Sequence, residues 1–154
     1  MAHIHDLIDF TVGAYIVHEN KVLLVDHIKL KTWMPIGGHI ELDEDPEQAI
    51  VREIKEESGL EVEIIGALKP DILAPGVKPL LAPVYMDIHD INESHKHIGL
   101  VYFSKSNTSK VTLAEEEHHD IKWFTKEELS NPKFAVRPYI KFYAEQALEK
   151  LSKD

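Results

Sequence analysis

The segment between Asp45 and Gly59 constrains the fold of this chain more than any other part of its sequence. Asp45 followed by Pro46 is typical of a helix start, because Asp caps free N–H groups and Pro accepts the first helical position. Gln48 has the spacing of a capping box, and Gly59 is typical of a residue that ends a helix. The sequence therefore predicts a helix over Pro46–Ser58.

Three glutamates of this helix, Glu53, Glu56 and Glu57, are spaced so that they share one stripe. Like charges at such spacing destabilise an isolated helix by roughly 0.2–0.5 kcal/mol per pair, which a bound cation would offset. Carboxylate oxygens are ligands that Mg²⁺ and Mn²⁺ prefer. The stripe is therefore either a divalent-metal site or a solvated acidic face. We expect Arg52 to lie too far round the helix from Glu56 to pair with it.

The rest of the chain mixes strand-like and helical patterns without a strict βαβ rhythm. We expect strands over 10–17, 21–27, 61–67, 84–88, 97–104 and 121–124, and irregular backbone over 33–38 and 69–83. Thr125 caps a short helix ending at Leu129, and the chain ends in an amphipathic helix with the stripe Ile140, Ala144, Ala147, Leu148 and Leu151. These patterns predict a single domain over 1–154 of the α/β (α+β) class with a mixed sheet.

Composition excludes several classes of function. The 154 residues include no cysteine, which excludes disulfides, thiolate metal sites and cysteine nucleophiles. With 17 basic and 27 acidic residues, the net charge of −10 gives no general attraction to nucleic acid or to an anionic membrane. The sequence shows no signal peptide and no apolar stretch near the ~20 residues that span a bilayer. We therefore expect a cytoplasmic protein.

The segment from Gly38 to Leu60 resembles the Nudix box of the Nudix hydrolase superfamily, G-x5-E-x7-R-E-U-x-E-E-x-G-U, where U is aliphatic. Every specified place is filled, by Gly38, Glu44, Arg52, Glu53, Ile54, Glu56, Glu57, Gly59 and Leu60. A chance match in a chain of this length is on the order of 10⁻⁷. Upstream, Ile36 stands where relatives often have proline, and Pro35 stands one place earlier. The resemblance implies a Nudix-type α/β/α sandwich with a mixed β-sheet.

The resemblance also implies a set of metal ligands and catalytic groups. The ligands would be the backbone carbonyl of Gly38 and the carboxylates of Glu53, Glu56 and Glu57, with Mg²⁺ as the cofactor and Mn²⁺ as a possible substitute. Glu57 is usually the central ligand, and Glu53 sometimes acts as the base. Glu44 and Arg52 would form an ion pair that ties the loop to the helix and orients the glutamates.

Further candidates lie outside the helix. Relatives often carry another glutamate on the loop before the last strand, as base or extra ligand, and Glu117 is the first choice here, with Glu116 second. His39 directly follows Gly38, so it either contacts substrate phosphate or is a solvated loop residue. One of His95 and His97 is a further candidate for the cleft.

The implied activity is hydrolysis of a pyrophosphate bond in a nucleoside diphosphate linked to another moiety. The expected partner is a small phosphorylated molecule of the nucleotide type, without duplex nucleic acid or membrane, and a homodimer is left open. One alternative is a Nudix domain that binds a nucleotide as a sensor without hydrolysis. Another is an ADP-ribose pyrophosphatase, because Pro75 lies at an offset from Leu60 seen in that subgroup. A Nudix-fold isomerase of prenyl diphosphates would use a cysteine, which this chain lacks.

Overall fold

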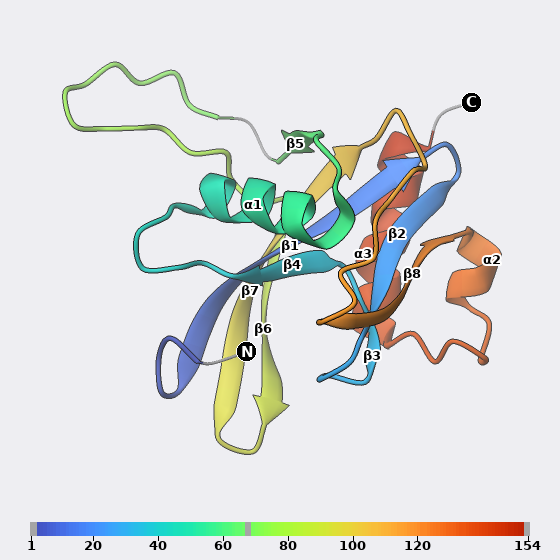
Figure 1. Ribbon diagram of the computed structural model, residues 1–154. Helices are drawn as coiled ribbons and strands as arrows, with labels where there is room; N and C mark the ends of the chain where they lie inside the picture. Colours follow the sequence, from blue (N-terminus) through green and yellow to red (C-terminus); the bar gives the residue numbers. More distant parts are fainter. Residues whose placement is uncertain (1–2, 67–68, 153–154) are drawn as a thin grey trace.

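The computed structural model describes residues 3–66 and 69–152, and its centre is a mixed sheet (Figure 1). Within these residues the sheet has eight strands in the order β3-β2-β1-β7-β5, with β4, β6 and β8 branching from it. The strands are β1 (Ile8–His18), β2 (Lys21–His27), β3 (Thr32–Met34), β4 (Ile36–His39), β5 (Glu63–Ile65), β6 (Tyr85–Asn92), β7 (His95–Lys105) and β8 (His118–Phe124). The helices are α1 (Pro46–Ser58), α2 (Lys126–Leu129) and α3 (Pro138–Leu151). The predicted fold class, with helices and a mixed sheet, is confirmed.

Strand β1 organises the sheet because its two edges have different partners. Along one edge it pairs in parallel with β7, from Ile8 opposite Lys96 to Val17 opposite Lys105. The other edge is divided between β4, which pairs antiparallel at residues 11–14, and β2, which forms a hairpin with β1 through Glu19 and Asn20. Strands β4 and β2 therefore pair with the same edge of β1, at different residues along its length.

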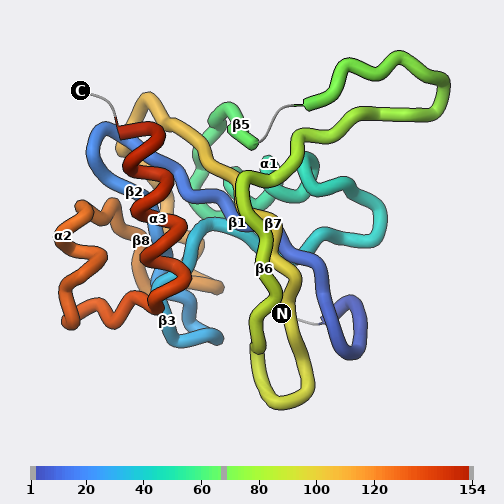
Figure 2. Tube along the Cα trace, turned by 180° about the vertical axis from the view of Figure 1, so that it is seen from behind, coloured from blue at the N-terminus to red at the C-terminus, as the bar shows by residue number. Residues whose placement is uncertain are grey.

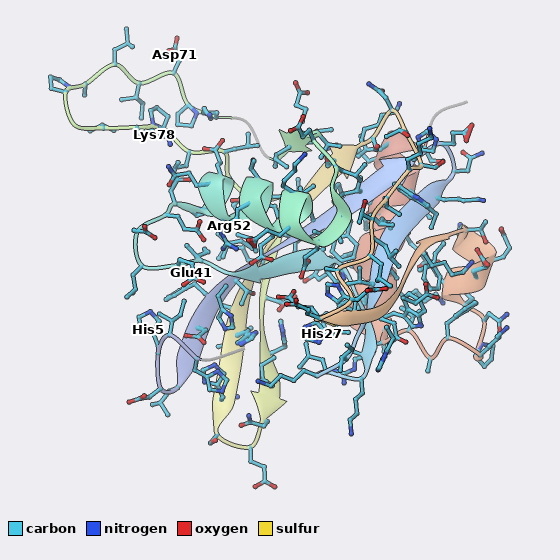
Figure 3. The ribbon with its side chains drawn as sticks, in the orientation of Figure 1. His5, His27, Glu41, Arg52, Asp71 and Lys78 are labelled. Atoms are coloured by element: carbon cyan, nitrogen blue, oxygen red, sulfur yellow. The ribbon has the colours of Figure 1, made fainter. Side chains whose placement is uncertain are left out.

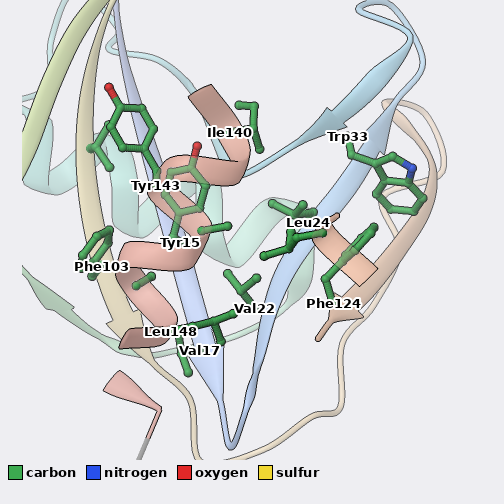
Figure 4. Packing of buried hydrophobic residues seen from close by; sticks show 14 residues of the cluster. Tyr15, Val17, Val22, Leu24, Trp33, Phe103, Phe124, Ile140, Tyr143 and Leu148 are labelled. Atoms are coloured by element: carbon green, nitrogen blue, oxygen red, sulfur yellow. The ribbon is translucent and has the colours of Figure 1, made fainter. Parts of the chain in front are cut away.

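Two hydrophobic layers cover the two faces of the sheet, because successive side chains of β1 point to opposite sides. Val12, Ala14 and Ile16 pack with buried residues of α1, whereas Tyr15 and Val17 pack with buried residues of α3. Figure 2 shows α3 crossing the back of the sheet, and Figure 4 shows Tyr15 and Val17 beside its side chains. The result is a three-layer arrangement of α1, sheet and α3.

Helix α1 has the bounds that the sequence predicts. The Asp45 carboxylate accepts the N–H of Gln48, and the Gln48 side chain accepts the N–H of Asp45, so the capping box is complete. Gly59 ends the helix with φ of 76°, a left-handed conformation that glycine adopts without strain. Both ends of the helix that carries the glutamates are thus fixed by local contacts.

The prediction of irregular backbone over 33–38 is wrong. These residues contribute to β3 and β4, which are separated by Pro35. Gly37 permits a close approach to β1, since a Cβ atom placed on it would lie 2.0 Å from the carbonyl oxygen of Val12. The hydrogen bonds to β1 outweigh the weak strand propensity of glycine.

The other strands and helices expected from the sequence are present, but several begin or end at residues other than those expected. The strand expected over 61–67 is β5 and covers only Glu63–Ile65, and residue 67 lies outside the described residues. Strands β6, β7 and β8 are longer than expected, because pairing with neighbours extends them into polar sequence. The segment 69–83 is a loop that projects beyond α1 in Figure 1. None of the described helices is long and apolar enough to cross a membrane.

Candidate active site

Arg52 is the centre of an ion-pair network on α1. Its guanidinium donates to both carboxylate oxygens of Glu44, at 2.6 and 3.1 Å, and to the backbone carbonyl of His39 at 3.1 Å. The hydrogen bonds from Arg52 hold the pKa of Glu44 below its usual value. The expected ion pair between Glu44 and Arg52 is therefore present, and it ties the loop before the helix to α1. Figure 3 shows Arg52 extending from α1 near this loop.

The expectation that Arg52 cannot pair with Glu56 is wrong. Nη1 of Arg52 lies 3.0 Å from Oε1 of Glu56 and 2.9 Å from Oε1 of Glu53. Residues four apart on a helix are neighbours on its surface, so the arginine reaches the glutamate one turn later. Arg52 therefore offsets part of the repulsion between the carboxylates.

Glu53 lies against the backbone of Gly38. A Cβ atom placed on Gly38 would lie 2.4 Å from Oε1 of Glu53, so only glycine leaves room for the carboxylate here. Burial and the Glu57 carboxylate together raise the pKa of Glu53 to about 8, although Arg52 opposes the rise. This carboxylate is therefore held partly buried against the backbone of β4.

Glu57 is the most buried of the three glutamates, with 2% of its surface exposed. Oε1 accepts the backbone N–H of Gly37 at 2.9 Å. Burial and the nearby Glu117 together raise the pKa of Glu57 to about 9, although the hydrogen bond from the Gly37 N–H opposes the rise. Ionising Glu57 in this position is unfavourable unless a positive charge is close by.

Glu117 and His118 lie close to Glu57 and form a cluster of possible metal ligands with it. Ligand atoms of Glu57, Glu117 and His118 lie within 4.8 Å of one another. Nε2 of the buried His118 is 3.3 Å from Oε2 of Glu57 without hydrogen-bond geometry, and both of its ring nitrogens lack a hydrogen-bond partner in the described part of the chain. Buried carboxylates with raised pKa values beside an unpartnered imidazole fit a divalent cation, because such an ion would satisfy both.

The other candidates differ in their positions. The carboxylate of Glu117 lies beside Glu57, whereas Glu115 and Glu116 are exposed neighbours on the same loop. Glu56 is more than half exposed. The ring of His39 is buried and lies 2.9 Å from the carboxylate of Asp9, on the other side of β4 from Glu53. Contact between His39 and substrate stays a prediction.

A pocket lined largely by apolar and aromatic side chains adjoins Gly37 and Gly38. It lies between the sheet and the start of α3, and its lining includes Tyr139, Tyr143, Asp87 and His89. Asp87 accepts the hydroxyl hydrogen of Tyr143 at 2.6 Å and lies 2.6 Å from Nδ1 of His89. Sequence reasoning did not single out the pocket residues Asp87 and His89, because alternation on β6 is their only signal and a solvated strand has the same pattern.

Comparisons with known proteins show the family of this chain. The NUDIX domain model of protein families matches residues 8–146. CTP pyrophosphohydrolase from Escherichia coli (strain K12) is 30% identical over 110 residues, which are 67% of this chain and 81% of that protein. A MutT-like protein of Streptomyces ambofaciens is 36% identical over 52 residues, 34% of each chain.

Solved structures give the same result for the fold. A NUDIX-family hydrolase from Clostridium perfringens superposes with a TM-score of 0.80 at 34% identity, covering 93% of this chain and 97% of that one. A C. elegans Ap4A hydrolase in a binary complex has a TM-score of 0.64 at 22% identity, with 94% and 95% covered. Fold, glutamate-bearing helix and relatives together define a hydrolase that acts on acid anhydrides. The chain belongs to the Nudix hydrolase family.

Proposed function

We propose that this protein hydrolyses the pyrophosphate bond of a nucleoside diphosphate linked to another moiety, with Mg²⁺ as its metal and Mn²⁺ as a substitute. The observation that carries the proposal is the convergence of Glu57, Glu117 and His118 within 4.8 Å, beside a pocket that reaches Gly37 and Gly38. The E. coli relative is named for CTP, which makes CTP the first substrate to test.

The residues of the box fit a divalent cation by chemistry and by position. Glu53, Glu56 and Glu57, with the carbonyl of Gly38, would hold it, and Glu117, whose carboxylate lies near that of Glu57, would serve as the base. When bound, it offsets the repulsion between these carboxylates and a polyphosphate and polarises the phosphorus centre. Arg52 is a positioning residue, because it holds Glu53 and Glu56 through one guanidinium group.

Glu117 is the proposed base. Its backbone is fixed because its carbonyl accepts the N–H of Ile28 at 3.0 Å, while its side chain remains exposed and can exchange protons with water. In the reaction the water oxygen bonds to phosphorus, and the bridging P–O bond breaks with its electron pair going to the leaving phosphate. One proton of the water passes to the Glu117 carboxylate. Glu53 is the alternative base.

The aromatic pocket is the proposed site for the nucleoside. Tyr139 and His89 lie with ring centroids 5.2 Å apart at the pocket wall, so they offer flat surfaces for a base. Asp87 offers carboxylate oxygens that accept hydrogen bonds from an exocyclic amine. A nucleoside seated here places its phosphates toward Gly38 and the glutamates, since the pocket includes both glycines of β4.

The test is a substrate panel of CTP, the other nucleoside triphosphates, Ap4A and ADP-ribose, each with Mg²⁺ and with EDTA. Products are separated by chromatography, which identifies the bond that breaks. We expect turnover of at least one nucleotide that requires the metal. Binding of panel members without turnover by any of them would contradict the proposal and favour the sensor.

A further inference from the structure

A second group of metal-ligating side chains lies at one end of β1 and β7, away from the glutamates of α1. It consists of His3, Asp9, His95 and His97, here called the histidine cluster, whose ligand atoms lie within 4.8 Å of one another. The parallel register places Asp9 directly opposite His97, and His95 lies two residues earlier on the same face of β7. The N-terminal segment brings His3 to them. The labelled neighbour His5 marks this region in Figure 3.

Asp9 is a fully buried carboxylate whose backbone contacts stabilise its ionised form. It accepts the backbone N–H of His5 at 2.6 Å and that of Ile4 at 3.2 Å, contacts that favour the charged form. The ion-pair partners of Asp9 among the described residues are imidazoles, not ammonium or guanidinium groups: His3 at 3.5 Å, His39 at 2.9 Å and His95 at 3.2 Å. A buried carboxylate without a permanent cation beside it is costly.

The hydrogen bonds of His95 fix its tautomer. Its Nδ1 lies 3.1 Å from the backbone carbonyl of Asp6, which can only accept, so Nδ1 carries a hydrogen. Nε2 of a neutral ring then presents its lone pair to the carboxylate of Asp9, 3.2 Å away. Two acceptors face each other unless a proton or a cation lies between them. A ligating histidine whose other nitrogen donates to a backbone carbonyl is the usual arrangement at metal sites.

Two further nitrogens around Asp9 have no partner. Nε2 of His39, a residue with 5% exposure, lies close to the Asp9 carboxylate but outside hydrogen-bond geometry, and Nε2 of His97 is also buried. Neither has a hydrogen-bond partner in residues 3–66 and 69–152. Buried side-chain nitrogens are rarely left unpaired, so the cluster has the character of a site built for an additional group.

We propose that the histidine cluster binds one Zn²⁺ ion through His3, Asp9, His95 and His97. Three imidazoles and one carboxylate are a ligand set that Zn²⁺ accepts in tetrahedral geometry, whereas Mg²⁺ prefers oxygen ligands. The site is separate from the glutamates, because Gly38 faces Glu53 and the next residue, His39, points to the other side of β4. The ion fastens the N-terminal segment to β7, beside the pocket that His97 lines.

The experiment measures zinc binding by the full chain, without an affinity tag that carries histidines. The protein is stripped with a chelator, dialysed, and titrated with ZnCl₂ alone, and bound zinc is counted by atomic emission. We expect one tightly bound zinc per chain and a rise in Tm on adding it, because an ion that binds only the folded state stabilises it. Co²⁺ in place of Zn²⁺ should give the intense visible absorption of a tetrahedral site.

Variants assign the ion to the cluster. His95→Gln with His97→Gln should abolish the tight site and the Co²⁺ spectrum, and circular dichroism checks that the sheet is kept. His3→Ala changes only a half-exposed terminal residue, so it tests the site without disturbing the core, and zinc affinity should fall at least ~10-fold. His119→Gln, at an exposed position of β8, is the matched control and should bind as the wild type does.

A further variant separates this ion from the glutamate site. Glu56→Gln with Glu57→Gln removes two carboxylates from α1, and we expect it to retain the tight zinc. Loss of the zinc in this variant would assign the ion to the glutamates and overturn the proposal. Absence of tight zinc in the wild type, or unchanged affinity in His3→Ala, would overturn it as well.

Discussion

The backbone of Gly38 and the carboxylate of Glu53 are packed so closely that a Cβ atom on Gly38 would lie 2.4 Å from Oε1 of Glu53. This contact joins β4 to α1. It explains in steric terms why the residue before His39 is a glycine.

Gly38→Ala should therefore impair hydrolysis without unfolding the protein. The added methyl group displaces the flexible end of Glu53, not the backbone, so the change in Tm should be small. Because Glu53 no longer occupies its position, turnover should fall by ~10-fold or more. The measurement is kcat together with the Mg²⁺ concentration for half-maximal rate. Turnover equal to the wild type would show that the contact has no role in the site.

Arg52→Lys tests the positioning role of the guanidinium. Lysine keeps the charge but cannot bind both oxygens of Glu44 while also holding Glu53 and Glu56. We expect activity or Mg²⁺ affinity to fall by about 10–100-fold, since groups that orient metal ligands have effects of this size. The control is Lys55→Arg, at an exposed position that pairs with Glu61. Equal losses in both variants would argue against a positioning role.

The pH dependence of stability tests the burial of Glu57. Burial raises the pKa of Glu57 from 4.5 to about 9 in the folded protein without metal. The folded state therefore holds this proton more tightly than the unfolded state, and stability falls as the pH rises from 4.5 toward 9. Glutamine cannot ionise. The free energy of unfolding of Glu57→Gln, relative to the wild type in EDTA, should thus increase between pH 5 and pH 9 in urea titrations. A difference that is constant over this range would contradict the assigned environment.

Glu117 and Glu53 are distinguished by what each variant loses. A base is needed for proton transfer alone, so Glu117→Gln should lower kcat by about 10²–10⁴-fold while leaving Mg²⁺ affinity within a few-fold. Glu53→Gln should weaken Mg²⁺ binding as well. The rate of Glu117→Gln should also climb with pH where that of the wild type is level, because hydroxide replaces the missing base. Near-full kcat with a normal pH profile in Glu117→Gln would move the base role to Glu53.

The sequence predicts helix α1 to the residue because its ends are set by local chemistry. Asp45, Gln48 and Gly59 each act within a few residues of the helix terminus, so their pattern is visible in the chain itself. Strands β3 and β4 were not predictable in this way. Glycine and proline suggest a loop at 33–38, and only the pairing of β4 with the distant strand β1 makes it a strand.

The two candidate metal sites also differ in whether local sequence or contacts between distant residues define them. The glutamates of α1 can be found from their spacing, and Glu117, chosen because relatives often carry a glutamate on this loop, lies near Glu57. Asp9 could not be found, because it is a single acidic residue near the N-terminus whose partner His95 is 86 residues away. Only the parallel register of β1 and β7 brings the two together.

The most direct test of the central claim is the rate of hydrolysis as a function of Mg²⁺ for the wild type and Glu57→Gln, with the best substrate of the panel. Glutamine keeps the size of the side chain but removes a ligand charge, so we expect turnover to fall at least ~10²-fold with the fold retained. Glu61→Gln, an exposed glutamate paired with Lys55, should behave as the wild type. Wild-type turnover in Glu57→Gln with Mg²⁺ present would contradict the account.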